Sequence, residues 1–165
     1  MKQEEMTKIL RSLVDLHYEC ITKIYKFGCL PFENPEYTDG RNIAKVNSAE
    51  FSSFEQLQTY LSQIYTSAET ARILKKAPEE EPLYFDKNGA LYVNLDRASF
   101  AGLPAPWKEY SVSIAELTEQ MCRFLVCVSY QEDTLRIGAG EITYEFTAVC
   151  ENGWKLEKYG RKQAQ

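Results

Sequence analysis

Histidine is almost absent from this chain, which has one in 165 residues. Zinc and other transition-metal sites are commonly built from several His and Cys ligands, and no carboxylates cluster here in their place, so we expect no metal site. Long apolar runs are also missing. None approaches the roughly 18 residues that a transmembrane helix needs, so we expect no membrane span.

A basic excess is missing as well, because 19 Lys and Arg stand against 24 Asp and Glu, a formal net charge of −5. Proteins that bind nucleic acids usually carry a basic patch or stripe that neutralises phosphates. The composition therefore argues against a nucleic-acid partner.

The five cysteines form no recognisable framework. Their number is odd and no C-x-x-C pair occurs, so we expect small packed side chains, or one accidental pair, in place of a disulfide scaffold. Cys122 and Cys127 are five residues apart and would face opposite sides of a shared strand. The cysteines are Cys20, Cys29, Cys122, Cys127 and Cys150.

The first five residues are polar and lack the apolar core of a secretory signal. Two expectations remain open. Either the protein is cytoplasmic, or an export segment was removed from it.

Length and composition predict one domain over residues 1–165. Such a chain buries roughly 70% of its unfolded surface. Hydrophobic residues make up 44% and charged residues 26%, as in ordinary folded domains. Aromatic residues are plentiful, with 11 Tyr, 8 Phe and 2 Trp. Such aromatic residues are typical of packed sheet surfaces. Together with the single His, this composition favours a binding function over acid–base catalysis.

Apolar residues at three-four spacing from Met6 to Phe27 predict one long amphipathic helix, ended by Gly28. Residues 29–36 contain two prolines and are expected to be irregular. Residues 37–46 predict a weak strand interrupted by a turn at Asp39-Gly40. The apolar positions of the helix are Ile9, Leu10, Leu13, Leu16, Cys20, Ile21, Ile24 and Phe27.

Two short helices follow. Ser52 and Glu55 form a capping box before the first of them, and Thr66 with Glu69 repeats this signature before a helix over residues 68–77.

From residue 83 the pattern alternates. Residues 83–93 predict a hairpin around Asn88-Gly89, because this dipeptide supplies the positive φ angles of a tight turn. Four further strands with short links imply an antiparallel meander. The expected class is α+β, with the long helix across a strongly curved sheet. The four strands are Tyr110–Leu117, Met121–Tyr130, Glu141–Cys150 and Trp154–Tyr159.

Several of these segments resemble the IseA-type DL-endopeptidase inhibitor family, best between about residues 50 and 110. The segments are 51–61, 64–67, 84–93 and Trp107, and 151–156 resembles the last turn and strand of the broader cystatin-like, nuclear-transport-factor-like fold. The resemblance implies a bacterial extracytoplasmic protein that binds cysteine-nucleophile peptidoglycan endopeptidases and occludes their cleft. It implies no catalysis and no cofactor.

The loop at residues 96–108 is the best functional candidate. Phe100, Leu103 and Trp107 are large apolar groups on a backbone restricted by Gly and Pro, which lowers the entropy lost on docking. Asp96 and Glu109 flank the loop and would contact a partner at the rim. In the competing interpretation, Trp107 and Phe100 fold back and plug the open end of the sheet.

Other hypotheses stay open. His17 and Cys20 have the spacing of a helical Cys–His pair, although packed side chains are the more ordinary outcome there. A small-ligand or proton-transfer domain of the same fold would use Asp86 as a base. A third alternative is a self-associating module whose sheet forms a homodimer. The tyrosines of the proton-transfer hypothesis are Tyr84, Tyr92, Tyr110 and Tyr144.

Overall fold

The structure is a computed structural model that describes residues 2–74, 81–100, 107, 109–130 and 140–162. These residues fall into two compact units. The first consists of Met1–Tyr18 and Pro104–Gln165, and the second is Glu19–Leu103. Helix α1 (Gln3–Lys23) therefore contributes residues to both units. The sequence-based expectation of a single domain over residues 1–165 stays a prediction.

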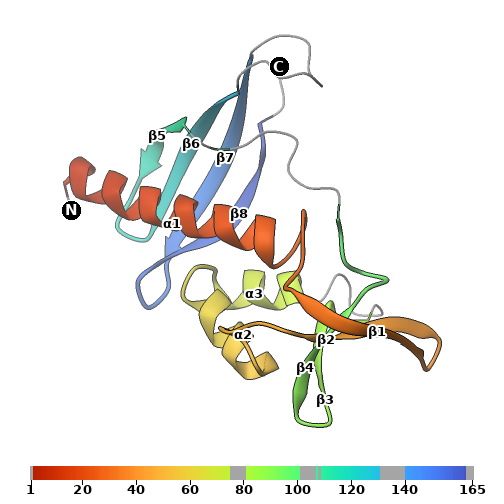
Figure 1. Cartoon of the computed structure of the whole chain (residues 1–165). Helices are drawn as coiled ribbons and strands as arrows, with labels where there is room; N and C mark the ends of the chain where they lie inside the picture. Colours follow the sequence, from red (N-terminus) through yellow and green to blue (C-terminus); the bar gives the residue numbers. More distant parts are fainter. Residues whose placement is uncertain (1, 75–80, 101–106, 108, 131–139, 163–165) are drawn as a thin grey trace. The chain divides into compact units, whose positions relative to one another are not determined.

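The described residues confirm the α+β class, with two antiparallel sheets (Figure 1). In the second unit, four strands are ordered β1-β2-β4-β3 and accompany two short helices. In the first unit, β5-β6-β7-β8 form the expected meander. The remaining elements are β1 (Phe32–Thr38), β2 (Arg41–Val46), α2 (Phe54–Ser62), α3 (Ser67–Leu74), β3 (Tyr84–Lys87), β4 (Ala90–Asn94), β5 (Glu109–Leu117), β6 (Met121–Tyr130), β7 (Gly140–Cys150) and β8 (Trp154–Arg161).

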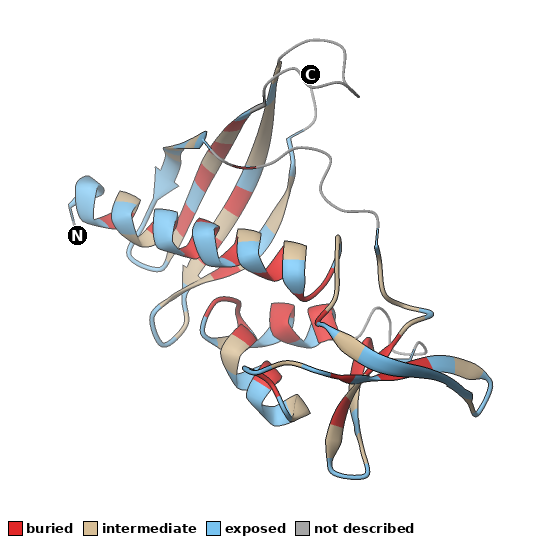
Figure 2. Cartoon of the chain, in the orientation of Figure 1, coloured by how far each residue is buried: buried red, intermediate tan, exposed pale blue. Residues whose placement is uncertain are grey.

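The core of the first unit lies between its meander and the part of α1 that crosses one sheet face (Figure 2). On β6, alternate residues from Cys122 to Val128 are fully buried, as the two-residue period of a half-buried strand requires. Cys127 points to the other side and is only partly buried, as predicted. The cystatin-like character of this sheet stays a prediction.

The first helix differs from its prediction at two places. Leu16 is 39% exposed, and the neighbouring His17 takes the buried position, with 1% of its surface exposed. The helix ends at Lys23, because Lys26 adopts φ 71° and the Phe27 amide donates to the Ile21 carbonyl. This bond spans one residue more than the C″-to-C3 bond of a Schellman ending, and the left-handed residue before it is Lys26 and not a glycine.

Gly28 has a different role from the predicted helix stop. A Cβ atom at this position would lie 2.3 Å from the Thr22 carbonyl oxygen. Only glycine therefore allows the chain to pass so close to the end of α1.

The expectation that residues 29–36 are irregular is wrong for the second half of that range. Strand β1 begins at Phe32 and pairs with β2, and its register shifts between Glu33 and Glu36. Asn34 adopts φ 49° at this shift, and Pro35 lies beside it. Proline has no amide hydrogen to donate to a neighbouring strand. Because the regular pairing is interrupted at this register shift, and because β1 is an edge strand, Pro35 is tolerated here.

The N-terminal cap of α2 lies one residue later than predicted. Ser53 is the cap, and its hydroxyl accepts a hydrogen bond from the Gln56 amide at 3.2 Å. The Gln56 side chain in turn accepts from the Ser52 amide at 2.8 Å. For α3 the predicted cap is confirmed, since Thr66 Oγ1 accepts from the Glu69 amide at 3.2 Å. The expected continuation to residue 77 lies outside the described residues.

The hairpin of β3 and β4 is confirmed. Asn88 and Gly89 adopt φ angles of 52° and 77°, and Phe85 pairs with Tyr92 across the ladder. Both turn residues occupy the left-handed region that an Asn-Gly turn requires. Asp39-Gly40 likewise joins β1 to β2.

Candidate functional site

The segment at residues 96–108 is described at 96–100 and at Trp107. Leu103, one of the predicted contact residues, lies outside the described residues. Asp96, Phe100, Trp107 and Glu109 each have a defined environment, and these environments differ.

Asp96 fastens the start of this segment to strand β2. Its carboxylate accepts hydrogen bonds from the backbone amide of Asn42 at 3.0 Å and from Asn42 Nδ2 at 2.8 Å. The Asp96 amide also donates to Asn94 Oδ1 at 3.1 Å. The hydrogen bonds from Asn42 favour the ionised carboxylate and lower the pKa of Asp96.

Phe100 lies four residues beyond this attachment and is 64% exposed. Its ring and that of Phe32 form a T-shaped pair, with the centroids 6.2 Å apart and the planes at 67°. Apolar side chains of this size are normally buried, and burying such a ring contributes about 1.5–3 kcal/mol. Burial of the Phe100 ring against a partner surface would therefore contribute favourable free energy to binding.

Trp107 belongs to the first unit and is buried, with 7% of its surface exposed. Its ring centroid lies 4.8 Å from that of Tyr144 and 5.7 Å from that of Tyr18. Trp107 thus packs back against the sheet, as the competing interpretation of the loop stated for this residue, whereas Phe100 is exposed and does not follow that interpretation. Glu109 is exposed at the first position of β5.

His17 and Cys20 occupy packed environments. The His17 ring centroid lies 4.2 Å from that of Tyr159 and 5.3 Å from that of Phe146, both edge-on. Burial raises the pKa of the Cys20 thiol to about 12, although the Tyr65 hydroxyl bonds to the sulfur. At neutral pH this thiol is protonated, and a protonated thiol is a weak nucleophile.

Asp86, the base of the proton-transfer hypothesis, is exposed and holds the start of α2. Its Oδ1 accepts a hydrogen bond from the Phe54 amide at 2.9 Å. A carboxylate at a helix N-terminus satisfies an amide that has no partner within the helix. The position of Asp86 is thus explained by helix capping.

The tyrosines of that hypothesis divide between the two units. Tyr84 is fully buried in the second unit, donates to the Ile24 carbonyl and accepts from the Leu30 amide, and burial raises its pKa. Tyr110 and Tyr144 belong to the first unit. Burial and a hydrogen bond to Asp15 raise the pKa of Tyr110 to about 12.

Among the described residues, no group of three His, Cys, Asp or Glu side chains could together hold a metal ion. No helix in the described ranges is both long and apolar enough to cross a membrane.

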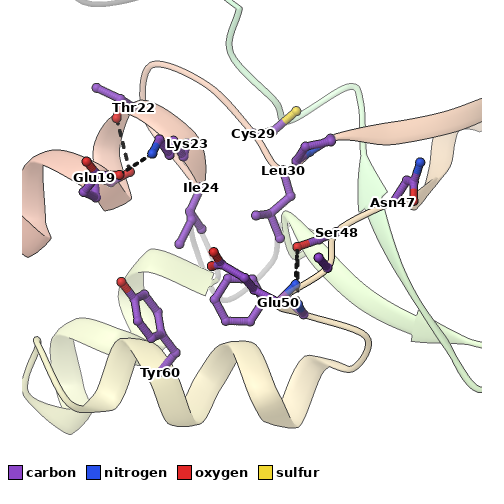
Figure 3. Close-up of a pocket in the computed structure, with 13 residues that line it drawn as sticks. Glu19, Thr22, Lys23, Ile24, Cys29, Leu30, Asn47, Ser48, Glu50 and Tyr60 are labelled. Carbon is purple, nitrogen blue, oxygen red and sulfur yellow. Dashed lines mark hydrogen bonds and ion pairs between the residues drawn. The ribbon is translucent and has the colours of Figure 1, made fainter.

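The second unit contains a pocket that the sequence did not indicate, with a volume of about 600 Å³ (Figure 3). Four separate segments contribute to it: the last turn of α1, the link before β1, residues 47–51 and helix α2. Because the lining residues are far apart in the sequence, they form no sequence motif that would have predicted the pocket. The lining residues are Glu19, Thr22, Lys23, Ile24, Cys29, Leu30, Pro31, Asn47, Ser48, Ala49, Glu50, Phe51 and Tyr60.

One side of this pocket is polar. Glu19 and Lys23 form an ion pair on α1, and Tyr60 faces them from α2 (Figure 3). The Tyr60 phenol has a raised pKa, mainly because of burial and also because Cys20, Glu50 and Glu19 are nearby. Burial also raises the pKa of the Cys29 thiol. Both groups are therefore neutral at pH 7.

Comparison of the chain with protein-family models, with curated proteins and with solved structures finds no match in any of the three. The resemblance to the endopeptidase inhibitors accordingly stays a hypothesis from sequence.

Proposed function

We propose that this chain is a non-catalytic protein-binding domain that inhibits a bacterial peptidoglycan DL-endopeptidase by occluding its substrate cleft. The observation that carries the binding role is the exposed ring of Phe100, four residues beyond the hydrogen bonds that join Asp96 to Asn42. The endopeptidase class comes from the sequence resemblance.

The local arrangement supports docking by Phe100. Aromatic side chains dominate the energetics of protein interfaces when they enter a pocket of the partner. A backbone held in advance loses less conformational entropy on binding. The hydrogen bonds of Asp96 hold the backbone in this way, and the ring of Phe32 contacts that of Phe100.

The other predicted contacts take different roles in this proposal. Glu109 is exposed and would form a rim contact, whose main effect is on association rate and specificity. Trp107 stabilises the first unit by packing among aromatic rings. A role for Leu103 stays a prediction.

The environments of the chemistry-bearing groups also support binding in preference to catalysis. Asp86 caps a helix, the Tyr84 hydroxyl joins two backbone groups, and Cys20 is a buried, protonated thiol. Each of these arrangements has a structural purpose. The homodimer and the extracytoplasmic location stay predictions, and the pocket of the second unit keeps small-ligand binding as the second candidate.

The test combines binding and inhibition. The full chain is titrated into the catalytic domain of a cysteine-nucleophile cell-wall endopeptidase, and both the dissociation constant and peptidoglycan hydrolysis are measured. Phe100→Ala should weaken binding about thirtyfold or more, the range of an interface hot spot. Tyr37→Ala is the matched control, because Tyr37 is an aromatic residue with 72% exposure outside the segment.

A saturable, inhibitory complex that is lost with Phe100→Ala and kept with Tyr37→Ala supports the proposal. Equal inhibition by both variants would remove Phe100 from the account. A capture experiment with bacterial cell-wall fractions tests the compartment and the partner class together.

A further inference from the structure

The pocket of the second unit has an apolar wall. Ile24, Leu30 and Phe51 are buried, and Pro31 and Ala49 extend the same surface. Its volume of about 600 Å³ lies within the range of roughly 300–1,000 Å³ that is usual for small-molecule sites. A ligand there would place an apolar body against these side chains.

The polar side of the pocket carries an excess of negative charge. Two carboxylates, Glu19 and Glu50, stand against one ammonium group, that of Lys23. Lys23 is paired with Glu19 on the same helix. The Glu50 carboxylate has no hydrogen bond or ion pair with another residue in the described ranges, and Figure 3 shows it directed toward the space in front of Tyr60.

The position of Glu50 is fixed by its backbone. Its amide donates to Ser48 Oγ at 3.2 Å, and the same hydroxyl accepts from the Phe51 amide at 3.3 Å. Residues 48–51 therefore form a small turn that presents the Glu50 side chain at the pocket.

Two aromatic rings lie next to this carboxylate. Phe51 and Tyr60 are in contact, with their centroids 5.3 Å apart and their planes at 59°. The face of an aromatic ring attracts cations, and a neighbouring carboxylate adds to this attraction. Since the Tyr60 phenol is neutral at pH 7, its oxygen is also available as a hydrogen-bond acceptor.

We propose that this pocket binds a small organic amine, with the ammonium group at Glu50 and Tyr60 and the apolar body against Ile24, Leu30 and Phe51. An anionic ligand is disfavoured, because it would meet two carboxylates and a cation that is already paired. This site is separate from Asp96 and Phe100, so the proposal does not depend on the inhibitor function.

The test uses three compounds that share an indole and differ in the end group. Tryptamine carries an ammonium, tryptophol a neutral hydroxyl, and indole-3-propionate a carboxylate. Each is titrated into the full chain at pH 7 by isothermal titration calorimetry, and amide shifts of residues 47–51 are followed by NMR. We expect saturable binding of tryptamine, about tenfold weaker binding of tryptophol, and the weakest binding of indole-3-propionate.

Glu50→Gln should weaken tryptamine binding about tenfold and leave tryptophol binding nearly unchanged, because only the charge is removed. Glu55→Gln is the matched control, since Glu55 is an exposed carboxylate on α2 that does not line the pocket. Both changes are at exposed positions, and circular dichroism verifies that each variant is folded.

Three results would overturn the proposal. These are no saturable tryptamine binding up to about 5 mM, equal affinity for all three compounds, and an unchanged tryptamine affinity in Glu50→Gln. Endopeptidase inhibition is measured on the same proteins, so loss of amine binding in Glu50→Gln with retained inhibition separates this site from Phe100.

Discussion

The side chain and the backbone amide of Asn42 both donate hydrogen bonds to the carboxylate of Asp96, at 2.8 and 3.0 Å. The Asn42 carbonyl in addition accepts from the Leu95 amide at 2.8 Å. Two residues 54 positions apart thus fix the point where the chain leaves β4. This attachment lies four residues before Phe100, at the start of the segment at residues 96–108.

Asp96→Ala should release this attachment without unfolding the second unit, because the side chain is exposed. Hydrogen exchange of the Asn42 and Leu95 amides should accelerate, while amides of the β3 and β4 ladder keep their wild-type rates. Unchanged exchange at Asn42 would show that the carboxylate does not hold this point in solution.

The same contact predicts an acid dependence. The pKa of Asp96 is lowered from its ordinary value of 3.8, so its stabilising contribution is complete above that value and is lost as the pH falls through the lowered pKa. An NMR titration of the Asp96 carboxyl measures this pKa directly. Below it the Asn42 amide should exchange as fast as in Asp96→Ala.

Tyr84→Phe should destabilise the second unit by about 1–3 kcal/mol, because two buried backbone groups lose their partner. The hydroxyl donates to the Ile24 carbonyl and accepts from the Leu30 amide. The control is Tyr92→Phe on the adjacent strand, where the ring stacks on Phe85 and the residue is half-buried. Urea unfolding measures both, and equal effects would contradict the proposed role of the Tyr84 hydroxyl.

Trp107→Ala and Phe100→Ala should differ in stability, because Trp107 packs inside the protein whereas Phe100 is proposed to contact a partner. Trp107 is buried among aromatic rings, and its truncation should cost about 3–5 kcal/mol of unfolding free energy. Phe100→Ala removes an exposed ring and should change stability by no more than about 0.5 kcal/mol. Thermal unfolding followed by circular dichroism measures both variants, and a large loss with Phe100→Ala would make that residue structural.

Thiol reactivity should follow burial. Cys20 and Cys122 are fully buried, and burial raises their pKa values to about 12 and about 11. Both should resist a disulfide reagent at pH 8 in the folded protein, whereas the exposed Cys150 should react first. Mass spectrometry of the labelled peptides gives the order, and labelling of Cys20 before Cys150 would contradict these environments.

Local rules predicted the parts of the fold that local chemistry determines. Asn88-Gly89 forms its hairpin because the required φ angles are intrinsic to that dipeptide. The alternation of β6 follows directly from burial of one face. The cap at Ser53 was missed by one residue, because Ser52 and Ser53 each precede a suitable partner three residues later.

Other features depend on contacts that no local pattern contains. Strand β1 exists because β2 pairs with it around the irregularity at Asn34, although Pro31 and Pro35 argued against regular structure there. The attachment of Asp96 to Asn42 and the pocket around Glu50 join distant segments, and neither residue belongs to a motif. Such sites become visible only when the fold places their members together.

The most direct test of the proposed function is peptidoglycan hydrolysis by a cysteine-nucleophile endopeptidase in the presence of the purified full chain. We predict dose-dependent inhibition that the Phe100→Ala variant loses and the Tyr37→Ala variant keeps. Full hydrolysis at saturating wild-type chain, or equal inhibition by both variants, would contradict the account.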